Sequence, residues 1–382
     1  MNWYSFRAIL IAFSKSFSLN RGSLRFISIR RIIAFLLIIP HFLILFFINS
    51  FFLLLDELFF PKFRNQSTDK LLFIVGIPRS ATTYLVHLLH NDKQQFTGYR
   101  LWEYLFAPSI IQKYLFIYLN KLNSFLGNPL KYITKRIDII LFRKTGKIHK
   151  MGLMMPDEDE FLFLYNFSSI YFYFFFPEVK ALEPFVFHDT SIPVSVRKKN
   201  MDFFERCIQR HNYVFNRADT KYYISKSPGF SPKIGSIAQK FPQAKFINPI
   251  RTPFEAIPSA ISLISKNYGM FCSMPVAYPM ATETRDMLLQ WYIHTNQLMK
   301  DFIKNRGIVL LFTDITGNTT FVQKQIYTFL NLETLNLIPF ELNSKKKKSP
   351  FKSDHKYDRG TGIDIEHIKS KLEGVLPEAL LY

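Results

Sequence analysis

The chain has 382 residues, of which 48% are apolar, and this length suits one α/β domain of roughly 300 residues with an N-terminal appendage. Its two cysteines, Cys207 and Cys272, lie far apart and outside any CxxC spacing, which excludes a disulfide framework and predicts no metal site. The formal net charge of +20 is spread along the chain and forms no DNA- or RNA-binding motif, so we expect no nucleic-acid partner. The charge suits a phosphate-bearing ligand or an anionic membrane surface, although many soluble proteins are basic without a specific reason.

The first 60 residues are predicted to associate with a membrane bilayer. Residues 32–55 carry no formal charge and are long enough for about 36 Å of helix, against roughly 30 Å of bilayer core. Residues 1–19 have the composition of an amphipathic interfacial helix. Basic residues without acidic companions precede the apolar run and place the N-terminus in the cytosol. A spanning helix, a shallow re-entrant element kinked at Pro40 and a buried core helix all stay open, and so does the side of the membrane on which the rest of the chain lies.

Residues 71–91 predict a strand, a tight loop and a helix. Leu71 to Val75 are all apolar, as in central parallel strands that are covered on both faces. Gly76 and Pro78 shape the turn, and the residues that follow it are Arg79, Ser80, Ala81, Thr82 and Thr83. Amides at the start of such a helix bind phosphate, although the hydroxyls alone are also typical of a simple helix cap. A Walker A lysine is missing, and the planar Arg79 favours oxyanion contacts on one phosphate group.

Two further strands are predicted at Tyr222–Ser225 and Ala244–Ile250, and each ends in a basic residue. Lys226 follows the first strand and Arg251 the second. Because ligands bind at the carboxyl ends of strands in open parallel sheets, we expect both side chains near the phosphate loop. For Lys226 the alternative is an ordinary surface lysine.

Two other segments have more than one interpretation. The acidic residues from Asp157 to Glu160 follow Pro156 and predict either the first turn of a helix or, with the aromatic run up to Phe176, the edge of an acceptor site. Residues 121–150 mix basic and apolar residues, which indicates an interfacial or solvated helix and a linker.

The stretch FIVGIPRSATTYLVHLL, residues 73–89, resembles the 5′-phosphosulfate loop of sulfotransferases, which use 3′-phosphoadenosine 5′-phosphosulfate (PAPS). The strand that ends in Arg251, followed by Ser259 on the next helix, resembles the 3′-phosphate site of that family. The segment KSPGFSPK, which begins at Lys226, is similar to the one that precedes this strand in the carbohydrate and tyrosylprotein branches. The resemblance implies a P-loop-NTPase-like three-layer α/β fold with a mostly parallel central sheet in residues 61–382, a membrane-associated helix in residues 1–60, and PAPS as co-substrate without a metal.

The resemblance also implies roles for individual residues. Glu103 lies about twenty residues past the loop, where other branches have the catalytic base; a structural ion pair is the alternative. Arg79 and Lys226 would stabilise the leaving phosphate. The donor-binding residues would be Arg79 to Thr83, Arg251, Ser259, Lys352 and His355. The chain departs from the family pattern at Ala81, where glycine is usual, at Ile250, where histidine is frequent, and at Phe312, where tyrosine is common.

We therefore expect a membrane-associated sulfotransferase that modifies a hydroxyl or amine of an unknown acceptor, with a lipid or glycan suggested by the apolar N-terminal region. A nucleotide-dependent kinase is disfavoured by the missing Walker lysine. A nucleotide-binding scaffold without catalysis is the other alternative, and Ala81 is its main support, because a Cβ at that position narrows the phosphate cradle.

Overall fold

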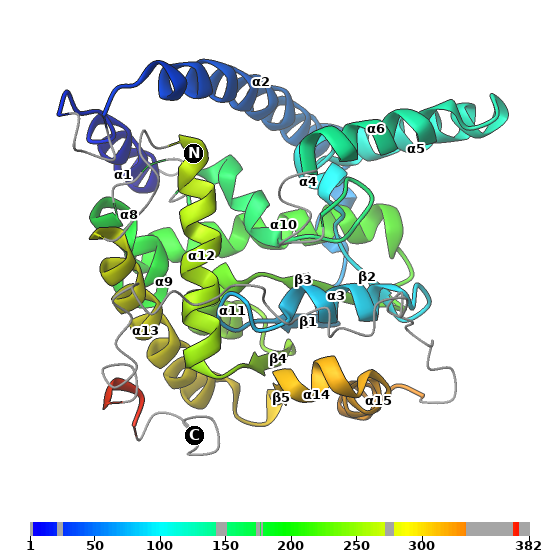
Figure 1. Ribbon diagram of the computed structural model, residues 1–382. Coiled ribbons are helices and arrows are strands. Elements are labelled where there is room, and N and C mark those ends of the chain that lie inside the picture. Colours follow the sequence, from blue (N-terminus) through cyan, green and yellow to red (C-terminus); the bar gives the residue numbers. More distant parts are fainter. Residues whose placement is uncertain are drawn as a thin grey trace.

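The structure is a computed structural model, and it describes residues 3–20, 26–142, 151–172, 176, 179–271, 279–333 and 370–373. A five-stranded sheet in the order β2-β3-β1-β4-β5 lies at its centre, and every strand pairing is parallel (Figure 1). The strands are β1 (Leu71–Ile74), β2 (Phe96–Thr97), β3 (Tyr222–Lys226), β4 (Lys245–Ile250) and β5 (Gly307–Leu311). The strands predicted from residues 71, 222 and 244 are confirmed to within one residue at either end.

Helices cover both faces of the sheet, and the side chains of β1 alternate between them. Leu72 and Ile74 pack against α3 (Thr82–His90) and α15 (Thr319–Leu330). Leu71 and Phe73 pack on the opposite face against α10 (Val194–Phe215) and α11 (Ile234–Lys240). Full burial of all four residues explains why this strand shows no polar alternation. The expected three-layer α/β fold is confirmed.

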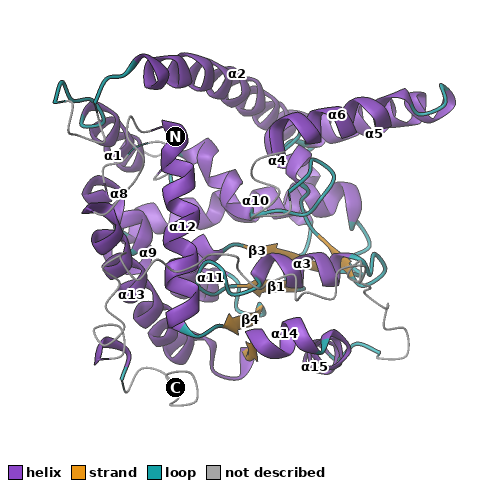
Figure 2. Ribbon diagram, viewed as in Figure 1, coloured by secondary structure: helices purple, strands orange, loops and turns teal. Residues whose placement is uncertain are grey.

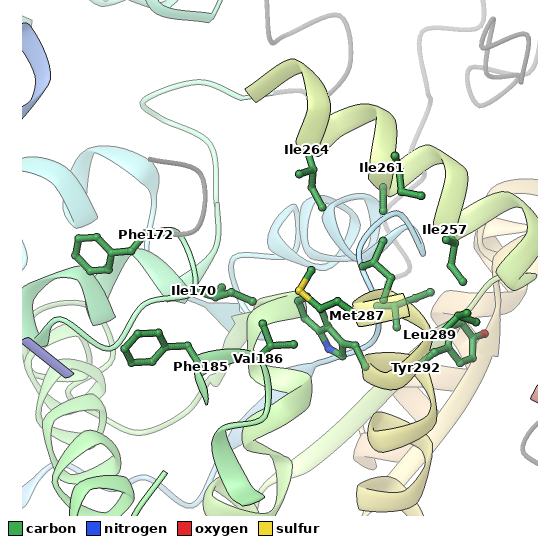
Figure 3. Packing of buried hydrophobic residues seen from close by; sticks show 14 of the residues in the cluster. Ile170, Phe172, Phe185, Val186, Ile257, Ile261, Ile264, Met287, Leu289 and Tyr292 are labelled. Carbon is green, nitrogen blue, oxygen red and sulfur yellow. The ribbon is translucent and has the colours of Figure 1, made fainter. Parts of the chain in front are cut away.

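A third cluster of buried apolar residues joins the N-terminal helices to the body of the molecule. Figure 3 shows Ile257, Ile261 and Ile264 of α12 (Pro253–Phe271) beside Met287 and Tyr292 of α13 (Pro279–Leu298). The same cluster includes residues of α1 (Trp3–Ser14), α2 (Ile29–Phe59) and α8 (Val179–Val186). Both N-terminal helices therefore pack on the domain that contains the sheet. The domain boundary at residue 60 stays a prediction.

The remaining elements are short or lie at the edge of the body (Figure 2). They are η1 (Pro61–Asn65), α4 (Leu101–Phe106), α5 (Ile110–Phe125), α6 (Pro129–Phe142), η2 (Asp159–Asn166), α9 (His188–Ser191), η3 (Pro228–Lys233), η4 (Met299–Ile303), η5 (Lys304–Arg306) and α14 (Phe312–Gly317). Within the described residues one segment, Arg31–Phe59 of α2, is long and apolar enough to cross a membrane by length and composition, and little of it is buried. In the views of Figures 1 and 2, α5 and α6 project from the body beyond the end of α2.

Candidate functional site

The loop between β1 and α3 turns sharply at Gly76. This residue has φ 127°, and a Cβ placed on it would meet the backbone oxygen of Pro249 at 3.0 Å, so only glycine fits. The Ser231 hydroxyl accepts a hydrogen bond from Gly76 N at 2.8 Å and donates one to Gly76 O at 2.8 Å. One side chain of η3 thus fixes the start of the loop. The spacing of the turn residues did not reveal Ser231, because its partner Gly76 lies 155 positions away.

Ala81 has a left-handed backbone, with φ 68° and ψ 18°, immediately before α3. A Cβ in this conformation costs roughly 1–2 kcal/mol relative to the right-handed region, whereas glycine carries almost no penalty. The structure therefore explains why glycine is the residue that suits this position, and it shows that the loop closes with alanine in place.

We expect Ala81→Gly to raise the free energy of unfolding by about 1 kcal/mol, because it removes the left-handed penalty while adding only a modest entropy to the unfolded chain. Urea unfolding of the two proteins measures this difference. Affinity for an adenosine bisphosphate should stay equal or increase. Thr83→Gly, at a helical position of the same segment, is the control and should be destabilising. A loss of stability in Ala81→Gly would contradict the strain that we assign to this residue.

The structure brings Arg79, Arg251 and Ser259 together, although they come from two segments about 170–180 residues apart. Arg79 Nε donates to Ser259 Oγ at 3.0 Å, and Arg251 NH1 donates to Arg79 O at 3.3 Å. Ser259 lies on α12, two turns beyond the end of β4 that carries Arg251. The two predicted donor-binding motifs therefore meet at one place.

Arg251 is held from several sides. Its guanidinium lies over the ring of Phe312 at 4.3 Å, Nε donates to Glu255 Oε2 at 3.0 Å, and its backbone oxygen accepts from the Tyr292 hydroxyl at 2.8 Å. Phe312, which stands where tyrosine is common in the family, thus makes a cation–π contact with Arg251. Glu255 and Tyr292 carried no sequence signal, since each is recognised only through its contact with Arg251.

The start of α3 offers donors for an anion. Leu85 N is bonded to Ala81 O, so the amides of Thr82 and Thr83 precede the first intrahelical bond. Ser80 is completely buried, and its hydroxyl finds no hydrogen-bond partner among the residues that the structure describes. Thr82 is buried and Thr83 half-buried. These donors and the positive end of the helix fit a phosphate or sulfate group.

Lys226 lies at the carboxyl end of β3, opposite Ile74 in the parallel ladder, and therefore beside the first residues of the loop. Its Nζ donates to Glu158 Oε1 at 2.5 Å, and the lysine side chain is buried. Glu158 is partly accessible, with a side chain that is 12% exposed, and its other oxygen accepts from the Tyr171 hydroxyl. The structure thus places a carboxylate next to the lysine that was predicted for the site.

The acidic run has a different role at each position. Glu160 pairs with Lys233 at 2.7 Å, and the Asp159 carboxylate accepts from the hydroxyls of Tyr104 at 2.6 Å and Tyr223 at 2.9 Å. Burial raises the pKa of Asp157 to about 7, and the negative charge of Glu158 adds to this effect, whereas Lys226 opposes it. A 3₁₀ helix, η2, does begin at Asp159, as the helix-start interpretation predicted. The run is nonetheless a buried polar cluster rather than a solvated first turn.

We expect the Asp159 carboxyl to make stability depend on pH. Burial raises its pKa from 3.8 to about 7, so between these values the folded chain binds more protons than the unfolded chain and the free energy of unfolding falls as pH rises. Asp159→Asn, which retains an oxygen acceptor for the two tyrosines, should flatten this fall. Urea unfolding across that pH interval measures the slope, with Asp202→Asn at a half-exposed position as control. An unchanged slope would contradict the raised pKa.

Glu103 lies in a separate buried cluster on α4. It accepts from Arg100 N at 3.1 Å and lies 3.3 Å from Lys113 Nζ and 3.2 Å from His211 Nδ1. Burial alone would raise its pKa, but the charges of Lys113 and His211 and these hydrogen bonds lower the pKa of Glu103 to about 2. These contacts match the structural ion pair that was the alternative interpretation of this residue. A carboxylate so tightly paired is a weak proton acceptor, which argues against the expected role as base.

Two predicted donor-binding residues, Lys352 and His355, lie outside the described residues. Among the described ones, no group of three His, Cys, Asp or Glu side chains could hold a metal ion. Within the described residues, the candidate site comprises the loop, Arg251 and Ser259 at one end and Lys226 with Glu158 at the other.

Comparisons with known proteins bear on the family and the fold of the chain. A model of the sulfotransferase family matches residues 72–336. The sulfotransferase STF1 from Mycobacterium tuberculosis H37Rv has a similar structure, with a TM-score of 0.65 over 97% of this chain and 91% of its own, at 14% identity. The sulfotransferase STF9 from Mycobacterium avium has a TM-score of 0.57 over 82% of this chain and 78% of its own, at 16% identity. At such identities these two structures support the fold alone. No curated protein matches the chain significantly.

Proposed function

Because the chain belongs to the sulfotransferase family, we propose that it transfers a sulfuryl group from PAPS to a hydroxyl or amine group of an acceptor. The observation that carries this proposal is the junction of Arg79, Ser259 and Arg251, which joins a phosphate loop to a second basic site. A donor with phosphates at both its 5′ and 3′ positions needs two such sites.

PAPS supplies an activated sulfuryl group whose S–O bond to the 5′-phosphate breaks as the acceptor oxygen or nitrogen bonds to sulfur. The chain's own residues hold the charge that develops. Arg79 and the first amides of α3 bind the 5′-end, and Lys226 stabilises the leaving phosphate oxygen. Arg251 and Ser259 bind the 3′-phosphate, and the face of Phe312 lies beside Arg251.

We assign the proton acceptor to Glu158 rather than to Glu103. Glu158 touches Lys226 and is partly accessible, so an acceptor hydroxyl can reach it. When Lys226 turns to the donor, its ion pair with Glu158 breaks, and the Glu158 oxygen that held it becomes available to the proton of the acceptor. The same lysine thereby couples donor binding to proton removal from the acceptor.

Titration of the purified protein with 3′-phosphoadenosine 5′-phosphate, with ATP as comparison, tests the donor class. Preference for the bisphosphate supports a PAPS-dependent enzyme. Preference for ATP would favour a kinase. If the protein bound the bisphosphate but transferred no labelled sulfuryl group from PAPS to any component of a membrane extract, a scaffold would be favoured. Ala81 no longer supports the scaffold by itself, because the loop accommodates its Cβ.

For the acceptor we propose a lipid or a lipid-linked glycan, since the apolar helix α2 is part of the same body as the site. Cells with and without the protein are labelled with sulfate, and comparison of their lipid extracts identifies the product. A labelled lipid fraction that disappears without the protein is the expected result. Equal labelling of a small soluble sugar by the full chain and by a chain without residues 1–60 would contradict it.

A further inference from the structure

The inner face of α2 is polar in its second half, and it is bonded to the rest of the protein. Asn49 is fully buried; its Nδ2 donates to Leu105 O at 2.9 Å and to the Tyr165 hydroxyl at 2.7 Å, and its Oδ1 accepts from Gln112 Nε2 at 2.6 Å. A helix that leaves the body to cross a bilayer would give up all three hydrogen bonds in a medium that offers no replacement.

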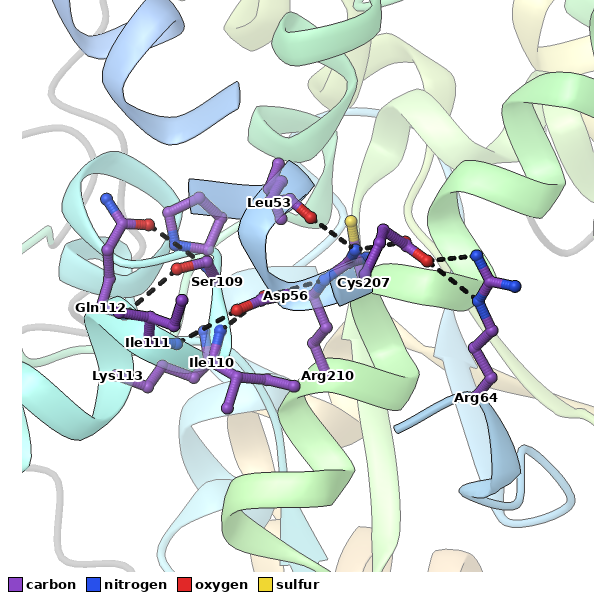
Figure 4. Close-up of polar contacts among 12 residues, drawn as sticks. Leu53, Asp56, Arg64, Ser109, Ile110, Ile111, Gln112, Lys113, Cys207 and Arg210 are labelled. Carbon is purple, nitrogen blue, oxygen red and sulfur yellow. Dashed lines mark hydrogen bonds and ion pairs between the residues drawn. The ribbon is translucent and has the colours of Figure 1, made fainter. Parts of the chain in front are cut away.

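Two helical turns further along the same face, Asp56 makes a second anchor (Figure 4). Its carboxylate accepts from the backbone amides of Ile110 at 2.8 Å and Ile111 at 3.2 Å, at the start of α5, and from Arg210 Nε on α10 at 3.0 Å. The first half of α2 is held by aromatic contacts, such as Phe35 stacked on Phe176 at 6.3 Å. The helix is thus attached along its whole length.

The outer face of α2 is apolar and exposed. Leu36, Ile44, Phe47, Leu54 and Leu58 are each between 57% and 71% exposed. Their spacing of three, four, seven or eight residues places them on one stripe, opposite Asn49 and Asp56. An attached helix with such a stripe is typical of one that lies in the plane of a membrane surface.

The hairpin of α5 and α6 extends this surface beyond the body (Figure 1). Its turn is built by Asn123, whose Oδ1 accepts from Leu130 N at 2.8 Å, and by left-handed Gly127 and Asn128. At the tip, Phe125 is 88% and Leu126 is 69% exposed. The start of α5 packs on α2 and α10, whereas the tip exposes these apolar side chains, which fits insertion of the tip into an apolar medium rather than water.

The charges of the hairpin identify the kind of surface that it meets. Its exposed charged residues are Lys121, Lys131, Lys135 and Arg136. Its one carboxylate, Asp138, is half-buried and accepts from Leu153 N at 2.9 Å. Basic residues around exposed aromatic and aliphatic side chains favour anionic lipid head groups.

From these contacts we propose that the outer face of α2 and the α5–α6 hairpin form one monotopic binding surface for an anionic lipid bilayer, and that α2 does not cross it. The N-terminal helix and the catalytic residues then lie on the same side of the membrane. This proposal does not depend on the sulfuryl-transfer chemistry, so its experiment can fail while the proposed function holds, and the reverse.

Flotation of the full chain with vesicles tests the surface. Binding to vesicles of equal parts phosphatidylcholine and phosphatidylglycerol should exceed binding to phosphatidylcholine alone and should weaken with salt. Phe125→Glu should reduce it by roughly tenfold or more, since burial of one phenylalanine contributes about 1.5–3 kcal/mol. Phe321→Glu is the matched control, because Phe321 is 46% exposed on α15, away from this surface, and that variant should bind as the parent does.

The topology is tested by synthesis in the presence of sealed vesicles, so that a spanning helix has the chance to insert. In a chain with Cys272→Ser, the remaining Cys207 is buried and burial raises its pKa to about 12, so it stays unreactive. Single cysteines at the exposed positions Ser14 and Lys324 should both be labelled by an impermeant maleimide from the outside.

Protection of one cysteine while the other is labelled would overturn the monotopic arrangement. Failure to bind either kind of vesicle, with the full chain eluting as a dimer that Phe125→Glu dissociates, would replace the lipid by a second copy of the chain and would overturn the proposal as a whole. If Phe125→Glu and the parent protein bound the anionic vesicles equally, the α5–α6 hairpin would not be part of the membrane-binding surface.

Discussion

Glu158→Gln should lower kcat for sulfuryl transfer by about 10²- to 10⁴-fold, the usual contribution of a positioned general base. The substitution keeps the size of the side chain and a hydrogen-bond acceptor for the Tyr171 hydroxyl, so that the loss falls on proton removal. The dissociation constant of 3′-phosphoadenosine 5′-phosphate should change little, because the donor site contains Lys226 and not its carboxylate partner. Turnover with the acceptor found by labelling, together with calorimetric binding of the bisphosphate, measures both quantities.

Glu103→Gln separates this assignment from the one that the sequence favoured. It leaves Lys113 buried without its carboxylate, so we expect a loss of stability of about 3–5 kcal/mol, with kcat of the folded protein almost unchanged. A pH profile adds a second readout: loss of the acidic limb in Glu158→Gln and its retention in Glu103→Gln. The opposite pattern, with kcat lost only in Glu103→Gln, would return the role of base to Glu103.

The phosphate loop could be predicted because its signals are local. Gly76 and the apolar run before it fix a strand and a turn within a few residues, and the loop then has to lie at the carboxyl edge of the sheet. The same rule brings Arg251 there from 172 positions away, as its contact with Arg79 O shows. Topology carries this information, since every strand of the sheet runs in the same direction.

The partner of each carboxylate could not be predicted from the sequence, because it depends on which side chains meet in space. Asp157, Glu158, Asp159 and Glu160 are neighbours in the sequence, yet their environments differ and only Glu158 contacts Lys226. Glu103 fits the family spacing equally well as a base and as a partner of Lys113. Spacing along the chain does not distinguish an accessible carboxylate from a buried one.

Hydropathy has the same limit at α2. An average over residues 32–55 detects an apolar segment, but it does not register that Asn49 faces inward and Leu54 outward. The position of two polar residues, seven apart on one face, is the feature that distinguishes an attached helix from a spanning one. Asp56 follows directly after the uncharged run, so an average over that run does not include it.

Arg251→Ala should weaken binding of 3′-phosphoadenosine 5′-phosphate by roughly ten- to a hundredfold, since a charge-assisted hydrogen bond contributes about 1.5–3 kcal/mol. Adenosine 5′-phosphosulfate, which lacks the 3′-phosphate, should bind almost as it does to the parent. The ratio of the two affinities is the informative quantity, because Arg251 also donates to Arg79 O and its removal can loosen the loop for both ligands.

Two further variants make that ratio decisive. Ser259→Ala removes the hydroxyl that positions Arg79 and should weaken both nucleotides, the bisphosphate more. Glu255→Gln frees the Arg251 guanidinium from a carboxylate that is 55% exposed, so it should leave the bisphosphate affinity equal or higher. Isothermal titration with each nucleotide measures the affinities of Arg251→Ala, Ser259→Ala and Glu255→Gln, on proteins shown to be folded by circular dichroism. If Arg251→Ala weakened the binding of both nucleotides by the same factor, the arginine would support the loop without contacting the 3′-phosphate, and the assignment of Arg251 and Ser259 to the 3′-phosphate would be wrong.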